Sequence, residues 1–233
     1  MKNQNPLMIK DLFNKTSSRY DVLNDLLSLG LHRHWKKQTI SRVKPAPGEK
    51  WIDLCCGTGD LTFRLARFTD PGGEVVGIDF AEKALAIARK RHKKLPSLKI
   101  AWMNIDATST GLESHSFDGV LMSYGLRNLK DPVHGLIEIH RLLKTEGRAA
   151  ILDFNHPREG SIGDKFQKFY LKNIVVRLAK RLDLQDEYEY IQESINRFPT
   201  GNELEQLALK IGFSKASHQA IAGNQMGILF LES

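Results

Sequence analysis

From residue 51 onward, short apolar segments typical of strands alternate with stretches of helical periodicity. The helical stretches lie near residues 60–69, 81–94, 132–144 and 202–211. The strand-like segments cover residues 51–54, 74–78, 98–103, 117–123, 148–154, 214–221 and 226–231. This alternation predicts an α/β fold with a doubly wound, mostly parallel seven-stranded sheet, because parallel neighbours need a helical crossover. The last two segments are joined by only four residues, which predicts a hairpin and one antiparallel C-terminal strand.

Two helical blocks stand outside this alternation. Residues 1–44 have helical spacing of leucines and end at the sequence PAPG, and residues 160–200 follow the fifth strand. We expect a single domain spanning residues 1–233. In it, the N-terminal block forms a helical lid and the second block a helical insertion, both covering one end of the sheet.

The formal net charge of +7 is concentrated at the N-terminus. Residues 1–50 contain ten Lys or Arg against four Asp or Glu, which leaves +6. Such a segment suits an anionic membrane surface or nucleic acid, although a solvated helical face is the simpler interpretation. No aromatic–basic interleaving or known binding motif supports nucleic acid, which stays the alternative from a different functional class. No long apolar run or secretion signal is found, so we expect a cytoplasmic protein, and peripheral contact with a membrane surface stays an open alternative.

The segment WIDLCCGTGDL, residues 51–61, reads as a strand, a glycine turn and the start of a helix. It departs from the dinucleotide fingerprint, since Thr62 stands where the third glycine belongs. Asp60 occupies the helix N-terminus, where a dinucleotide would place its pyrophosphate, and a carboxylate there repels phosphate. A cofactor without phosphates fits better. S-adenosylmethionine, which carries a sulfonium cation, suits such an acidic loop.

Three aspartates follow successive strands of the predicted sheet: Asp53, Asp79 and Asp106. The carboxyl ends of parallel strands form the ligand-binding edge, where Asp79 can accept both ribose hydroxyls and Asp106 can meet the adenine amine. The alternative is that these carboxylates only cap helices. The expected S-adenosylmethionine-binding residues are Asp53, Gly57, Thr58, Gly59, Asp60, Asp79, Phe80, Asp106, Ala107 and Ser123.

The two cysteines, Cys55 and Cys56, are adjacent. Adjacent cysteines cannot adopt ordinary disulfide geometry, and no second cluster completes a zinc site. We therefore expect no redox or metal role and interpret them as small side chains that let the turn approach its ligand.

Several motifs resemble those of one known family. They are LFNKTSSRYDVLNDLLSLGLHRHWK at 12–36, DLCCGTGDLT, YGLRN after the fourth strand, DEYEYIQESINRFP at 186–199 and the C-terminal AGNQMGILFLES. Over nearly the whole chain the sequence is similar to the ubiquinone/menaquinone biosynthesis C-methyltransferases, which have the class I, Rossmann-like S-adenosylmethionine-dependent fold. The Cys55–Cys56 pair, DFNHP and RFPTG look most like the branch that methylates 2-phytyl-naphthoquinone.

The resemblance implies that the substrate is a lipid-tailed demethylnaphthoquinol, expected to be demethylphylloquinol in the last step of phylloquinone biosynthesis. A demethylmenaquinol or ubiquinone-pathway substrate is the alternative, as is another small molecule acted on by the same fold. A homodimer stays an open alternative to a monomer.

The chemistry of this expected reaction suggests a set of catalytic candidates. A quinone ring is electron-poor, so the nucleophile is the reduced quinol, ideally as its phenolate. Arg127 would stabilise that oxyanion or orient a water, since a guanidinium does not act as a base. Asn128 would hold a ring oxygen, Tyr20 would complete the pocket, and His156 is a second candidate for the base. The alternatives are an ordinary ion pair with an acid on a helix for Arg127 and packing alone for Tyr20.

Overall fold

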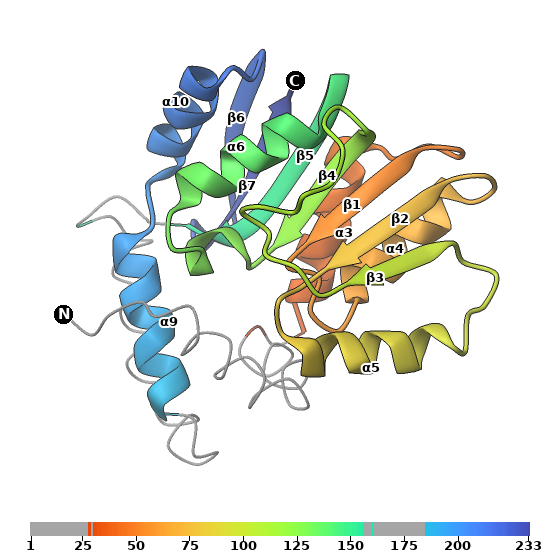
Figure 1. The fold of residues 1–233 in the computed structure, drawn as a ribbon. Coiled ribbons are helices and arrows are strands. Elements are labelled where there is room, and N and C mark those ends of the chain that lie inside the picture. The colour runs from red at the N-terminus through yellow and green to blue at the C-terminus, as the bar shows by residue number, and fades with distance from the viewer. Residues whose placement is uncertain (1–27, 29, 156–159, 161–184) are drawn as a thin grey trace.

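The computed structural model describes residues 28, 30–155, 160 and 185–233. Its centre is one seven-stranded sheet in the order β3-β2-β1-β4-β5-β7-β6 (Figure 1). The strands are β1 (Lys50–Leu54), β2 (Glu74–Ile78), β3 (Ile100–Met103), β4 (Phe117–Ser123), β5 (Leu143–Phe154), β6 (Lys215–Ile221) and β7 (Met226–Glu232). Strand β7 runs antiparallel to both β5 and β6, and the other pairs are parallel. The predicted doubly wound sheet with an antiparallel C-terminal strand is confirmed.

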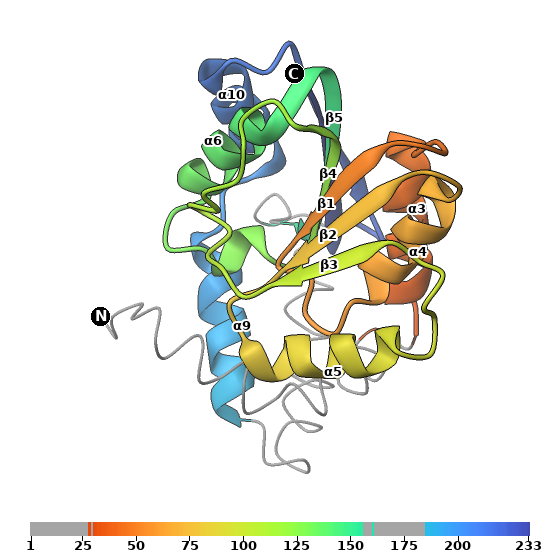
Figure 2. The same ribbon diagram turned by 45° about the vertical axis from the view of Figure 1, so that its right-hand side comes forward.

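Helices lie on both faces of this sheet. Figure 2 shows α3 and α4 on one side and α6 and α10 on the other. The helices are α3 (His32–Val43), α4 (Asp60–Thr69), α5 (Glu82–His92), α6 (Pro132–Leu142), α9 (Gln185–Arg197) and α10 (Gly201–Ile211), with a 3₁₀ turn η1 (Leu126–Asn128). Two of them begin at clear caps: Asp131 accepts from the Val133 N–H before α6, and Thr200 forms a capping box with Glu203 before α10.

The hydrophobic core occupies both faces of the central strands. The last four residues of β1 and of β2 are buried, as expected of parallel strands covered on both sides. One cluster joins the sheet to α6 and α10, and a second joins it to α3 and α4. This two-sided burial fixes the strands in place and leaves their carboxyl ends free to form a site.

Of the N-terminal block, residues 28 and 30–44 are described. Ile40 and Val43 of α3 are buried in the same cluster as the sheet, and α3 packs on β4, β5 and β7. Of the second block, α9 contacts η1 at the carboxyl end of β4. Within the described residues, no helix is both long and apolar enough to cross a membrane.

Candidate functional site

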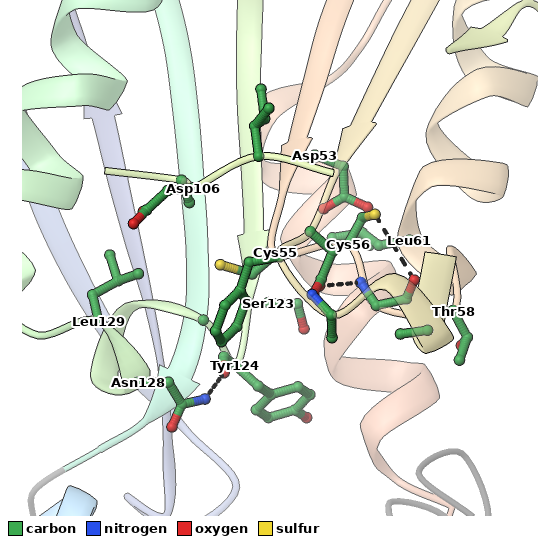
Figure 3. Close-up of a pocket in the computed structure, with 18 of the residues that line it drawn as sticks. Asp53, Cys55, Cys56, Thr58, Leu61, Asp106, Ser123, Tyr124, Asn128 and Leu129 are labelled. Carbon is green, nitrogen blue, oxygen red and sulfur yellow. Dashed lines mark hydrogen bonds between the residues drawn. The ribbon is translucent and has the colours of Figure 1, made fainter. Parts of the chain in front are cut away.

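A pocket lies at the carboxyl ends of β1, β2, β3 and β4 (Figure 3). Ten of the residues predicted for the site line it: Asp53, Gly57, Thr58, Asp60, Asp79, Phe80, Asp106, Ala107, Ser123 and Asn128. They reach it from the ends of four neighbouring strands, which is why the sequence places them up to 75 residues apart. Asn128 and Leu129 lie across the pocket from Thr58 and Leu61.

The glycine turn after β1 is held in a backbone conformation that needs small residues. Gly57 and Gly59 have φ of +55° and +84°, and Cys55 adopts φ +57° without being glycine. A Cβ on Gly59 would lie 2.6 Å from the indole of Trp102, so Gly59 serves the turn rather than lining the pocket. Behind the turn, Arg91 of α5 donates to the Thr58 carbonyl at 3.0 Å and to its hydroxyl at 3.2 Å.

Asp79 orders the same turn from the end of β2. One carboxylate oxygen accepts from the Gly57 N–H and the other from the Ala81 N–H, both at 2.8 Å. Burial raises the pKa of Asp79, and these backbone hydrogen bonds counter part of the rise. Asp79 therefore orders the glycine turn and the residue that precedes α5, and neither α4 nor α5 has a side-chain hydrogen bond from its N-cap residue. Each carboxylate oxygen has a second acceptor direction, which leaves room for a ligand hydroxyl.

Asp53 is the most deeply buried carboxyl of the pocket, with 1% of its surface exposed. Its Oδ2 accepts from the Thr62 hydroxyl at 2.5 Å, while Oδ1 has no hydrogen-bond partner among the described residues. Burial raises the pKa of Asp53 to about 7, against the opposing effects of Thr62 and Lys36. A cation bound in the pocket would favour its ionised form.

Asp60 begins α4 and is paired with two cations. Its Oδ2 lies 3.0 Å from the ammonium of Lys36 and its Oδ1 lies 3.3 Å from Nε of Arg64. Burial raises the pKa of Asp60, but Lys36 and Arg64 outweigh it, so the pKa lies below its usual value. The negative charge that was expected to attract a sulfonium is thus largely balanced, whereas Asp53 keeps a buried oxygen without a hydrogen-bond partner among the described residues.

At the other end of the pocket, Asp106 follows β3. Its Oδ1 accepts from the backbone N–H and the hydroxyl of Thr108, at 2.8 and 2.7 Å. Ser123 ends β4, and its buried hydroxyl has no partner in the described part of the chain. A buried hydroxyl without a hydrogen-bond partner is costly, and so is the unpartnered Oδ1 of Asp53 on β1, unless a ligand bonds to each of them.

Arg127 lies in η1 beside the pocket and not among the residues that line it. Its buried guanidinium forms an ion pair with Asp153 of β5, as the alternative interpretation anticipated, although the partner lies on a strand rather than a helix. It also stacks over the Phe154 ring and donates to Oδ1 of Asn128.

Asn128 is the residue that carries this network into the pocket. Its Oδ1 accepts from Arg127 and from the Tyr190 hydroxyl of α9, the latter at 3.1 Å. Its amide nitrogen donates to the Tyr124 carbonyl at 2.7 Å. The side chain is thereby held in one orientation, with one amide hydrogen left to donate.

Several residues at the site escaped sequence reasoning, among them Lys36 and Tyr190. Lys36 lines the pocket, and the signal for it was its place four residues before Ile40, on the buried face of a helix. Tyr190 lies within a quoted motif but had no assigned role. Tyr20 and His156 fall outside the described residues, so their predicted roles stay predictions.

The model of the ubiE/COQ5 methyltransferase family matches residues 1–230. A 2-phytyl-1,4-naphtoquinone methyltransferase of Nostoc sp. strain PCC 7120 is 43% identical over 224 residues, covering 96% of this chain and 97% of its own. A chloroplastic 2-phytyl-1,4-beta-naphthoquinone methyltransferase of Arabidopsis thaliana is 44% identical over 225 residues, covering 94% and 84%.

Solved structures share the fold at lower identity. A SAM-dependent methyltransferase from Aquifex aeolicus superposes with a TM-score of 0.62 at 16% identity, covering 98% of each chain. A Haemonchus contortus N-methyltransferase, solved with S-adenosylhomocysteine, gives a TM-score of 0.62 at 17% identity, covering 85% of this chain and 52% of its own.

Proposed function

We propose that this chain, which belongs to the ubiE/COQ5 methyltransferase family, methylates a ring carbon of a lipid-tailed demethylnaphthoquinol, with S-adenosylmethionine as methyl donor. The favoured substrate is 2-phytyl-1,4-naphthoquinol. The names of the similar cyanobacterial and plant proteins support this choice, as do the quoted motifs. A demethylmenaquinol or a ubiquinone precursor is the alternative substrate.

The observation that carries the proposal is the pair of unpartnered polar groups in the pocket. Asp53 Oδ1 and Ser123 Oγ are buried at the carboxyl ends of adjacent strands. S-adenosylmethionine brings the matching groups, namely cations for a carboxylate and polar atoms for a hydroxyl. The residues present therefore fit this methyl donor.

The pocket also offers a consistent division of binding roles. Asp106, Ala107 and Phe80 would hold the adenine, at the β3 end of the pocket. Asp79 would accept the ribose hydroxyls. Thr58 and the glycine turn would pass beside the methionine portion, whose ammonium would bind Asp53.

When bound, S-adenosylmethionine supplies an electrophilic methyl group on sulfur. The quinol carbon forms the new C–C bond as the S–CH₃ bond breaks, and loss of the ring proton restores aromaticity. The enzyme must align the two reactants and stabilise the phenolate, whose free pKa lies near 10.

Asn128 is placed to contact the quinol, because it lines the pocket while Arg127 does not. We assign its remaining amide hydrogen to the phenolate oxygen. Arg127 and Tyr190 then act as positioning residues that hold the amide, and the guanidinium charge adds electrostatic stabilisation from behind. Tyr20 and His156 stay candidates for completing the pocket and accepting the proton.

The two helical blocks are proposed to cover the pocket and receive the isoprenoid tail. The Tyr190–Asn128 hydrogen bond supports this for the second block, because it brings α9 to the pocket rim. The basic residues of the N-terminal block would let the enzyme contact an anionic membrane, where such quinols reside. Flotation with anionic vesicles at low salt is expected to recover the protein, and absence of lipid association would contradict this part.

The test of substrate choice is a comparison of chemically reduced acceptors that differ in the ring. Purified protein with S-adenosylmethionine is expected to methylate 2-phytyl-1,4-naphthoquinol, detected by a mass gain of one CH₂. A prenyl-tailed 1,4-benzoquinol with an unsubstituted ring carbon is expected to react at least tenfold more slowly. Preference for the benzoquinol would favour the ubiquinone branch, and reaction with neither would favour a different small molecule.

A further inference from the structure

Lys36 presents a buried ammonium group to the methyl-donor pocket. It belongs to α3, is 7% exposed, and its Nζ lies 3.0 Å from Asp60 Oδ2. Among the described residues that line the pocket, the lysines and arginines are Lys36 and Lys130. Lys36 is the one that lies at the glycine turn, while Lys130 follows η1 on the other side.

The order of the strands shows which end of the donor would meet Lys36. Across the sheet the order runs β3, β2, β1, β4. With adenine at β3 and ribose at β2, the amino-acid end must lie at β1, beside Asp53 and the start of α4. Lys36 reaches the pocket at this position, since its partner Asp60 is the first residue of α4.

At this end of the pocket, the two aspartates match only the positive group of an amino acid, so a protein cation is needed to match its carboxylate. The donor carries an ammonium and a carboxylate there. Asp53 suits the ammonium, but Asp53 and Asp60 would both repel the carboxylate. The ammonium of Lys36 is close to both acids: it is hydrogen-bonded to Asp60 and counters part of the burial effect that raises the pKa of Asp53.

We propose that Lys36 binds the carboxylate of the donor's amino-acid portion. This rests on the proposed function and adds a carboxylate-binding residue from outside the glycine turn. An ammonium has three hydrogens to donate, so Lys36 can contact the ligand carboxylate while keeping its bond to Asp60. Binding of the donor then ties the N-terminal helix α3 to the turn after β1.

The experiment compares S-adenosylhomocysteine with its decarboxylated analogue, S-adenosyl-3-thiopropylamine, by titration calorimetry. The two differ only in the carboxylate, and neither is turned over. Wild-type protein is expected to bind S-adenosylhomocysteine at least tenfold more tightly. Lys36→Met is expected to bring the two affinities within threefold, while Lys37→Met, at the exposed neighbouring position, keeps the wild-type ratio.

Removing Lys36 also leaves Asp60 paired with Arg64 alone, and the added negative charge could itself weaken binding of a carboxylate. The same comparison is therefore repeated in Asp60→Asn protein, which lacks that charge. In Asp60→Asn protein, adding Lys36→Met is still expected to abolish the preference for the carboxylate. If the double variant instead prefers S-adenosylhomocysteine as the wild type does, Lys36 only neutralises Asp60, and the proposal is overturned. Lys36→Arg, which keeps the charge, is expected to keep at least part of the ratio.

The measurement on wild-type protein can overturn the proposal by itself, whether or not the variants fold. Equal wild-type affinity for the two ligands overturns the role of Lys36 and leaves the proposed function standing. Failure of the wild-type protein to bind S-adenosylhomocysteine at all would overturn the proposed function as well.

Discussion

Arg127 and Asp153 form a buried ion pair at the carboxyl ends of β4 and β5, with Nε 3.2 Å from Oδ1. The backbone N–H of Arg127 also donates to Asp153 Oδ2 at 3.1 Å. Burial raises the pKa of Asp153, and the guanidinium is the largest opposing influence. The pair therefore fixes the η1 turn that presents Asn128 to the pocket.

Loss of Arg127 is expected to destabilise the fold, since it leaves a buried carboxylate without its cation. We expect Arg127→Ala to lower the free energy of unfolding by about 3 kcal/mol, measured by urea denaturation. Arg127→Ala with Asp153→Asn should recover part of that loss while turnover stays low. Near-normal turnover of the double variant would remove Arg127 from the mechanism.

Tyr190 is expected to affect turnover more than donor binding. Tyr190→Phe removes the hydroxyl that donates to Asn128 at 3.1 Å and keeps the ring in place. A lost neutral hydrogen bond is worth about 1 kcal/mol, so kcat should fall about fivefold. The affinity for S-adenosylhomocysteine should be unchanged. An equal loss in both quantities would indicate a general structural role instead.

Gly59 is expected to tolerate a methyl group less well than Gly57. Gly59→Ala combines a positive φ with a Cβ placed 2.6 Å from Trp102, and should cost about 2–3 kcal/mol in the free energy of unfolding. At Gly57 nothing lies within 4 Å of an added Cβ, so Gly57→Ala should cost only about 1 kcal/mol. If urea denaturation shows the same loss in the free energy of unfolding for both variants, Trp102 moves aside without cost and the prediction is wrong.

Asp53 gives the ligand-free protein a distinct pH dependence. Its pKa is raised from 3.8 in the unfolded chain to about 7, so between these values the folded state holds a proton that the unfolded state lacks. The contribution of Asp53 to stability is therefore present at low pH and is lost as the pH rises through about 7.

The matched variant for this effect is Asp53→Asn, which keeps a neutral side chain beside Thr62. Between pH 5 and pH 8 the wild-type free energy of unfolding should fall by at least about 1 kcal/mol more than that of the variant. Parallel pH profiles would show that Asp53 titrates normally.

Local patterns predicted most of the strands and the glycine turn, because both depend on residues close in sequence. Strand β5 was the clearest departure, since it begins at Leu143 where a helix was expected to continue to residue 144. Helix α6 ends at Leu142, and Leu143 pairs with Phe117 just before a register shift in β4. That early start depends on pairing with a neighbouring strand, which local periodicity does not contain.

The site was harder to predict wherever its contacts join distant segments. The acids at the strand ends were found because parallel strands share one edge. The balancing of Asp60 by Lys36 was not found, because those residues are 24 positions apart and belong to different predicted units. The same holds for Arg127, whose partner Asp153 lies on another strand.

The most direct test of the account is transfer of a labelled methyl group from S-adenosylmethionine to 2-phytyl-1,4-naphthoquinone, offered in its reduced or its oxidised form. The phenolate mechanism predicts label on the ring carbon of the quinol, with at least a hundredfold less on the oxidised quinone kept free of reductant. The product should carry the new methyl on carbon and not on oxygen. Equal labelling of the quinone, or an O-methyl product, would contradict the account.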